Sequence, residues 1–224
     1  MGSKNKLKRF KQNEDFENVI QPEREDIDLG IFQYKGLWRK EFFKNDNPIV
    51  LELGCGKGEY SVHLASLNKK TNFIGIDIKG ARFWRGAKTA VETGLTNVAF
   101  LRTQIELITS CFESNEVDEI WITFPDPQIK FKRTKHRLTN PEFLTKYKQV
   151  LKPNGLIHLK TDSEFLHGYT LGVLEHYPSE LLYAHHDIYN NLYSPKHATA
   201  VQTFYEKIFL KEGKSITYMQ FKLK

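Results

Sequence analysis

The chain has 224 residues, which is enough for one domain with a sizeable core. Hydrophobic residues make up 40% of the chain, and its 16 Phe and 10 Tyr favour a folded globular protein over a disordered one. The net charge of +6 favours anionic partners. Cys55 and Cys111 show neither metal-ligand spacing nor a pairing pattern, and we find neither a secretory signal nor an apolar run of membrane length. We therefore expect a soluble cytoplasmic protein that binds no metal.

The predicted elements alternate along the chain. The first 20 residues are polar and basic without clear periodicity, so we expect a flexible basic arm over 1–20 and a single domain over 21–224. Short apolar runs predict strands at 49–54, 73–77, 98–102, 117–124 and 155–161. Helical spacing occupies about 57–68, 80–93, 104–112 and 140–151, and a turn is expected at 153–155.

The C-terminal part of the chain differs from this alternation. Strands are expected at 181–189 and 215–224, with a helix near 199–211 between them. Together the elements predict an α/β fold with a mostly parallel seven-stranded sheet, helices on both faces and an antiparallel edge strand.

A glycine loop follows the first predicted strand in the segment LELGCGKGEY. Gly54 and Gly56 allow close approach of a ligand to the backbone, but Glu59 stands where the dinucleotide fingerprint needs its third glycine. Glu52 would repel a pyrophosphate and would suit an ammonium group, such as the methionine end of S-adenosylmethionine. The structural alternatives are a tight turn without a ligand and, for Glu52, a cap on the following helix.

Two further polar residues lie at the ends of the next strands. Asp77 ends the second strand, where a carboxylate can accept hydrogen bonds from both ribose hydroxyls in dehydrogenases and methyltransferases alike. Gln104 follows the third strand, where its amide oxygen can accept a hydrogen bond from the amine of adenine. A helix-start role suits Gln104 equally well.

The fourth predicted strand runs into the segment FPDP, which places Asp126 between Pro125 and Pro127. Both prolines fix φ, and Pro127 restricts Asp126 to extended conformations, so the carboxylate is preorganised. Ligands of doubly wound sheets bind beyond the carboxyl ends of the strands, and we expect this strand beside the first. Asp126 should therefore overhang the methyl donor. A plain Asp-Pro turn is the alternative.

A basic run follows Asp126 directly. Its cations are Lys130, Lys132, Arg133, Lys135 and Arg137, with Phe131 and His136 between them. Such a run suits a phosphate backbone, and its aromatic residues suit base stacking. The alternative is a solvated loop, but the position beside the predicted site favours a role in RNA binding.

The motifs LELGCGKGEY, FIGIDIKG, FPDP with its basic run, LKTD and TFYE together resemble the bacterial tRNA (guanine-N7-)-methyltransferases over about residues 48–210. The glycine loop alone indicates only a class I methyltransferase, and the combination of FPDP with the basic run is the specific part. The resemblance implies a Rossmann-like class I fold and methyl transfer from S-adenosylmethionine to N7 of a guanine in the tRNA variable loop. Three positions depart from the pattern: Gln128 replaces Trp, Asp77 replaces Glu, and Gln104 replaces Asp or Asn.

The resemblance also implies roles for particular residues. Binding of the methyl donor is implied for Glu52, Gly54, Gly56, Asp77, Gln104 and Asp126, with Asp126 at the reaction centre as the catalytic residue. Substrate contacts are implied for Lys130, Asp162, Thr203, Phe204, Tyr205 and Glu206. RNA contacts are implied for Lys132, Arg133, Thr134, Lys135, His136 and Arg137. Considered without the resemblance, Asp162 suits a helix N-cap equally, and Thr203 and Glu206 suit a solvated helix face beside the apolar face of Val201, Phe204 and Ile208.

The expected chemistry is simple, because guanine N7 carries an available lone pair and no proton that must be removed. Direct in-line displacement at the sulfonium methyl therefore needs no general base. The base has to be splayed out of its stack, and Asp126 would position the guanine, the donor or both.

Three other functions remain open. A class I methyltransferase for a small molecule or a protein would leave the basic run unused, and a non-catalytic RNA-binding module would leave the glycine loop unused. A nicotinamide oxidoreductase is disfavoured by Glu52 and the missing third glycine. The expected partner is tRNA, with no membrane, no obligatory protein partner and a monomeric or homodimeric state.

Overall fold

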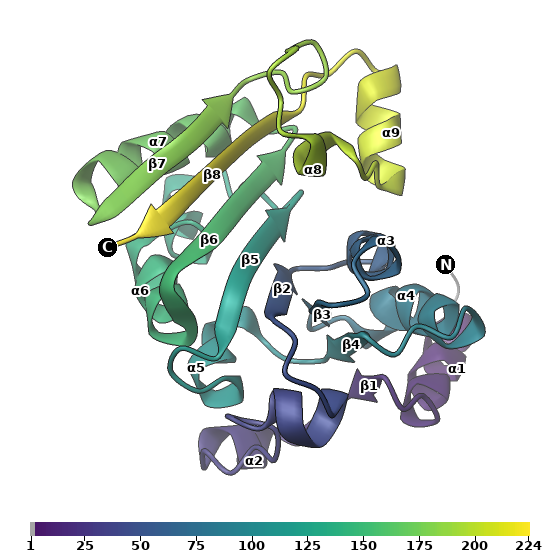
Figure 1. The fold of residues 1–224 in the computed structure, drawn as a ribbon. Helices are drawn as coiled ribbons and strands as arrows, with labels where there is room; N and C mark the ends of the chain where they lie inside the picture. Colours follow the sequence, from purple (N-terminus) through teal and green to yellow (C-terminus); the bar gives the residue numbers. More distant parts are fainter. Residues whose placement is uncertain (1–2) are drawn as a thin grey trace.

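The computed structural model describes residues 3–224, and its central feature is an eight-stranded sheet in the order β1-β4-β3-β2-β5-β6-β8-β7 (Figure 1). The strands are β1 (Val19–Ile20), β2 (Ile49–Leu53), β3 (Asn72–Ile76), β4 (Val98–Leu101), β5 (Val117–Thr123), β6 (Leu151–Thr161), β7 (Ser179–His185) and β8 (Thr217–Leu223). All neighbours from β1 to β6 are parallel, whereas β8 is antiparallel to both β6 and β7.

This sheet confirms the predicted architecture. All seven expected strands form, and β5 pairs with β2, as predicted from their order along the chain. The antiparallel strand β8 lies one place inside the edge, which β7 forms. The eighth strand, β1, has only two residues, which is too short for a periodic pattern to predict.

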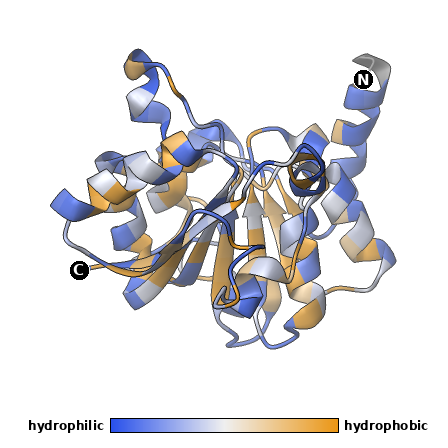
Figure 2. Cartoon of the chain, turned by 90° about the horizontal axis from the view of Figure 1, so that it is seen from above, coloured by the Kyte–Doolittle hydropathy of each residue, from blue (hydrophilic) through white to orange (hydrophobic). Residues whose placement is uncertain are grey.

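Helices cover both faces of the sheet. They are α1 (Ser3–Glu14), α2 (Arg24–Asp28), the π-helix η1 (Trp38–Phe43), α3 (Glu59–Leu67), α4 (Gly80–Glu92), the 3₁₀-helix η2 (Ile105–Leu107), α5 (Ile108–Cys111), the 3₁₀-helix η3 (Phe131–His136), α6 (Pro141–Val150), α7 (Glu164–His176), α8 (Lys196–Thr199) and α9 (Phe204–Lys211). One core joins the sheet to η1, α6 and α7, and a second core joins it to α3, α4 and α8. Apolar residues concentrate on the central strands between these layers (Figure 2).

The N-terminal segment differs from the expected flexible arm. Residues 3–14 form α1, which packs against α4, and the amide of Asn13 donates a hydrogen bond to the carbonyl of Gly80. The guanidinium of Arg102 lies 4.8 Å from the ring centroid of Phe10. The sheet begins at Val19, ahead of the expected domain boundary at residue 21. The sequence did not predict this helix because α1 has no wide apolar stripe, which is the pattern that identifies a helix packed on a core. Contacts to α4 hold it in place instead.

Two local predictions also need correction. The turn expected at 153–155 lies inside β6, where Asn154 has a φ of 64° and the β5–β6 register shifts. An irregularity of this kind keeps the strand continuous while satisfying the turn chemistry of the Pro-Asn-Gly segment. The single helix expected over 104–112 is divided into η2 and α5.

Among residues 3–224, no helix is both long and apolar enough to cross a membrane.

Candidate active site

The glycine loop, residues 54–58, connects the carboxyl end of β2 to the start of α3. Gly54, Gly56 and Gly58 have φ values of 73°, 56° and 72°, which are positive and favour glycine. A side chain on Gly58 would collide with the ring of Phe100, whereas a Cβ on Gly54 would meet no atom within 4 Å. Gly58 therefore serves packing, and Gly54 leaves open space at the edge where ligands of such sheets bind.

Glu52 is a buried carboxylate at the end of β2. Its Oε2 accepts hydrogen bonds from the backbone N–H of Ser61 at 2.9 Å and from the Ser61 hydroxyl at 2.5 Å, and its Oε1 accepts one from Thr123 at 2.7 Å. Burial raises the pKa of Glu52 to about 7, against the opposing effect of these hydrogen bonds. The predicted helix-capping contact is confirmed, and Glu52 also lines a cavity beside the glycine loop.

Asp77 is fixed by two backbone donors. Its Oδ2 accepts a hydrogen bond from Gly56 at 3.0 Å, and its Oδ1 accepts one from Lys79 at 2.8 Å. Each oxygen keeps a further lone pair, and the carboxylate lines a cavity of about 280 Å³ together with the apolar residues Ile78, Ile105, Leu138 and Phe143. The remaining lining side chains are polar or charged, and a carboxylate beside a partly apolar cavity suits the ribose and base of a nucleoside.

Gln104 lines the same cavity, but its amide oxygen accepts a hydrogen bond from Arg24 at 2.8 Å. Gln104 also stands at the N-cap of η2, where its side chain makes no capping hydrogen bond. The helix-start alternative is therefore confirmed for the backbone, whose carbonyl accepts a hydrogen bond from the N–H of Leu107, and not for the side chain. The adenine contact remains a prediction, and in this structure Arg24 occupies the oxygen that it would use.

A second cavity, of about 120 Å³, adjoins the first across the glycine loop, because Gly54 lines both. Its other lining residues come from four parts of the chain: Glu52, Cys55, Gly56, Lys57, Glu59 and Tyr60, then Arg82, then Thr123 and Phe124, then Thr203 and Tyr205. Glu52 and Thr123, which are hydrogen-bonded to each other, both line the smaller cavity. The two cavities together form an elongated space, with Asp77 lining one part and Glu52 lining the other.

The FPDP loop, residues 124–129, forms the other side of this site. Phe124 and Gln128 have positive φ values of 48° and 50°, an uncommon conformation for residues other than glycine that is concentrated at functional sites. Asp126 is exposed, and its Oδ1 accepts a hydrogen bond from the backbone N–H of Gln128 at 3.0 Å. The Asp-Pro turn therefore exists. Asp126 lines neither cavity, but Phe124 lines one and Gln128 lines the other.

The basic run divides into exposed and buried members. Lys130, Lys132, Arg133 and Lys135 are exposed, Phe131 is 91% exposed, and Thr134 and His136 are half-buried. Arg133 and His136 also line the larger cavity. These cations are accessible to a partner, and their contact with RNA remains a prediction.

Arg137 differs from these residues, because it is only 5% exposed. Its guanidinium donates hydrogen bonds to the carbonyls of Gln128 and Ile129 and lies 4.8 Å and 4.3 Å from the ring centroids of Phe165 and Tyr169. In this structure Arg137 supports the FPDP loop and, unlike its neighbours in the basic run, does not present its guanidinium to solvent. Its contact with RNA remains a prediction.

The segment 203–206 carries a buried polar group where the residue pattern suggested a solvated face. Thr203 and Glu206 form a capping box at the start of α9, and Glu206 is fully buried. The carboxylate of Glu206 lies 2.6 Å from the ammonium of Lys160, which is also fully buried, and accepts a hydrogen bond from Tyr189. This buried ion pair anchors α9 to β6, which leaves Phe204 and Tyr205 about half exposed beside the site.

Asp162 lies half-buried after β6, and Lys130 is exposed at the start of η3. The N-cap of α7 is Ser163, which accepts a hydrogen bond from Leu166, so the capping alternative for Asp162 is wrong.

Sequence reasoning missed Ser61, Thr123 and Lys160 as supports of the site. Lys160 lies within the motif LKTD, but only the fold shows that it meets Glu206.

Comparison with known proteins agrees with this geometry. The sequence model of a family described as "Putative methyltransferase" matches residues 46–219. A protein of Christiangramia forsetii named tRNA (guanine-N(7)-)-methyltransferase is 70% identical over 224 residues, which is 100% of each chain. A protein of the same name from Bacteroides fragilis is 46% identical over 226 residues, covering 98% of this chain and 86% of that protein. The chain belongs to the tRNA (guanine-N(7)-)-methyltransferase family.

Solved structures extend the likeness in fold. A 16S rRNA methyltransferase, KamB, has a TM-score of 0.62 at 14% identity, covering 83% of this chain and 90% of that chain. This likeness confirms the predicted Rossmann-like class I methyltransferase fold. In this member of the tRNA (guanine-N(7)-)-methyltransferase family, Gln128 takes the expected Trp position, and its side-chain oxygen accepts a hydrogen bond from Arg133.

Proposed function

We propose that this protein transfers the methyl group of S-adenosylmethionine to N7 of a guanine in the variable loop of tRNA. The observation that carries this proposal is the arrangement around Gly54. Two adjoining cavities, one with Asp77 and one with Glu52, lie beside the FPDP loop, which presents Asp126, and the basic run after that loop presents four exposed cations. In a member of this family, none of the alternative functions uses both the cavities and the cations.

The residues present fit the methyl donor. Asp77 is held by Gly56 and Lys79 with its remaining lone pairs available for the ribose hydroxyls. Glu52 would face the ammonium of the methionine end, and a neighbouring cation stabilises the ionised form of a carboxylate whose pKa burial raises to about 7. When bound, S-adenosylmethionine supplies a methyl group on a positively charged sulfur.

The protein's task is then to orient a guanine against that methyl group. Holding the nitrogen, the methyl carbon and the sulfur in line can lower the activation free energy of methyl transfer by up to about 7–11 kcal/mol. Asp126 is exposed at the point where the FPDP loop passes between the two cavities, so a splayed guanine can reach it. Its carboxylate would accept hydrogen bonds from the guanine N1–H or amino group and oppose the positive charge that develops on the ring.

The exposed cations after Asp126 would hold the RNA. Lys130, Lys132, Arg133 and Lys135 present positive charge beside the site, and the exposed ring of Phe131 offers a stacking surface. Substrate contacts from Asp162 and from Tyr205, which lines the smaller cavity, would complete the pocket for the base.

The test is to incubate the protein with labelled S-adenosylmethionine and unmodified tRNA, digest the RNA and identify the labelled nucleoside. We expect N7-methylguanosine. A matched transcript that carries 7-deazaguanine in place of guanine lacks the accepting nitrogen and should remain unlabelled. Label in another nucleoside, or none in tRNA, would overturn the proposal.

A further inference from the structure

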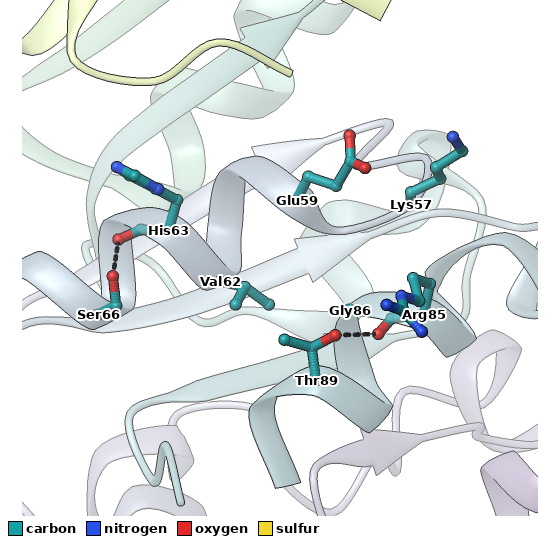
Figure 3. A pocket seen from close by; sticks show the side chains of 8 residues that line it. All are labelled: Lys57, Glu59, Val62, His63, Ser66, Arg85, Gly86 and Thr89. Carbon is teal, nitrogen blue, oxygen red and sulfur yellow. Dashed lines mark hydrogen bonds between the residues drawn. The ribbon is translucent and has the colours of Figure 1, made fainter. Parts of the chain in front are cut away.

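A third hollow lies outside the proposed methyl-transfer site, between α3 and α4 (Figure 3). It has a volume of about 300 Å³ and is lined by Lys57, Glu59, Val62, His63, Ser66, Arg85, Gly86 and Thr89. Lys57 and Glu59 also line the smaller cavity of the site, so the two hollows adjoin across the end of the glycine loop. Lys57 and Arg85 lie at one end of the hollow, and His63 and Ser66 lie at the other (Figure 3).

Three cations connect this hollow to the site. Arg82 and Arg85 are three residues apart on α4 and therefore share a helix face. Arg82 lines the smaller cavity, Arg85 lines the outer hollow, and Lys57 lines both. We name these three residues the α4 basic line.

The charges of this line are largely uncompensated. Over residues 3–224, neither the Arg82 nor the Arg85 guanidinium takes part in an ion pair or hydrogen bond, and both side chains are exposed. Within that same range, the one acid that lines the hollow is Glu59, whose Oε2 accepts a hydrogen bond from the backbone N–H of Phe204 at 2.9 Å. The ammonium of Lys57 lies 3.6 Å from the Phe204 ring centroid, which is a cation–π contact and not an ion pair.

The α4 basic line and η3 lie on different sides of the proposed site. Helices α3 and α4 pack against one face of the sheet. Arg133 and His136 of η3 line the larger cavity together with Leu138 and Phe143, which belong to the core on the other face, so the two groups of cations approach the site from opposite faces of the sheet. A nucleotide that is splayed into a site carries a phosphate on each side of its sugar, and cations on both flanks fit that arrangement.

We propose that the α4 basic line binds the RNA sugar-phosphate backbone on the side of the target guanine opposite η3. This inference rests on the proposed function and adds a second contact surface that the FPDP motif and its basic run do not include. His63, Ser66 and Thr89 extend the surface with further hydrogen-bonding groups for phosphate or ribose.

The experiment compares two variants with the same loss of charge. In one, Arg82→Gln and Arg85→Gln remove two cations from the line. In the other, Lys69→Gln and Lys70→Gln remove two exposed cations from the turn before β3, near the amino end of that strand. The affinity of each full-length variant for unmodified tRNA is measured at several salt concentrations.

We expect the arginine variant to bind tRNA about tenfold more weakly at low salt, with the slope of log affinity against log salt reduced by about one per arginine. The lysine variant should keep the wild-type slope and affinity. The single variant Arg85→Gln lies outside the smaller cavity and should show about half of the change in slope, with an unchanged thermal midpoint of unfolding.

An unchanged slope in both arginine variants would overturn the proposal. An equal change in the arginine and lysine variants would overturn it as well, since only net charge would then matter. If wild-type protein binds tRNA through this line but leaves guanine unmethylated, the backbone contact stands and the proposed function fails.

Discussion

The glycine loop and the FPDP loop border the same site but are built in opposite ways. The glycine loop is fixed by buried contacts: Gly58 fits against Phe100, and Glu52, on the strand before the loop, has buried hydrogen-bonding partners for both of its oxygens, while Gly54 borders both cavities. The FPDP loop is open: Asp126 is exposed, and the backbone is held in place by Arg137 beneath it. A small methyl donor is best bound in a preformed pocket. A guanine that belongs to a large RNA is best bound by a carboxylate that is accessible on a supported loop.

The largest expected effect tests the buried side of this comparison. Because the folded-state pKa of Glu52 is raised to about 7, the protonated carboxyl favours folding; this stabilisation is complete below about pH 4.5 and is lost as the pH rises through 7. Relative to Glu52→Gln, wild-type protein should lose about 2–3 kcal/mol of unfolding free energy between pH 5 and 8. Denaturant unfolding at several pH values measures this. A pH-independent difference between the two proteins would contradict the prediction.

Substitution of Asp126 tests the exposed side. Asp126→Ala should lower methyl transfer to tRNA by at least about a hundredfold, because an interaction that strengthens as charge develops on guanine is removed. Binding of tRNA and thermal stability should change little, since the side chain is exposed and its hydrogen bond to Gln128 is local. Single-turnover rates at saturating tRNA measure the effect. Turnover within a few-fold of wild type would show that Asp126 serves only the turn.

Removing the support beneath the FPDP loop should have a smaller effect. Arg137→Gln removes contacts to two loop carbonyls and to two aromatic rings, and we expect a loss of about 1–2 kcal/mol in unfolding free energy. The turnover rate should fall as well, because the carbonyls of Gln128 and Ile129 lose the hydrogen bonds that hold the FPDP loop. Lys135→Gln is the matched control, since it removes an exposed cation from the same run. Equal stability of the two variants would rule out the supporting role.

The smallest effect separates the two kinds of cation within the run. One variant neutralises three exposed cations, Lys132, Arg133 and Lys135. It should reduce the slope of log affinity for tRNA against log salt by about one for each phosphate that is no longer neutralised. Arg137→Gln should leave that slope nearly unchanged, because its guanidinium is enclosed. Filter binding across a salt series compares them. If Arg137 changes the slope as much as its exposed neighbours do, it must reach the RNA through a rearranged loop.

Much of the fold and part of the site follow from local sequence patterns. Apolar runs such as residues 49–53 and 73–76 identify buried parallel strands, because such strands are covered on both faces. The spacing of Gly54, Gly56 and Asp77 along the chain is enough to place them at one edge of the sheet, where Gly56 donates a hydrogen bond to Asp77. The short strand β1 and helix α1 escaped prediction because distant contacts, not periodicity, hold them.

What the sequence determined by itself was therefore the position of seven strands along the chain, the carboxyl edge that carries the site, and the residue types gathered there. Only the tertiary structure decided which charges are available. Arg137 and Glu206 read as solvated residues in the sequence, yet one is enclosed by carbonyls and rings and the other is paired with Lys160. Arg82 and Lys57, 25 residues apart in the chain, come to line one cavity. The physical reason is that the solvation of a charge depends on neighbours from distant segments, and a local pattern does not contain them.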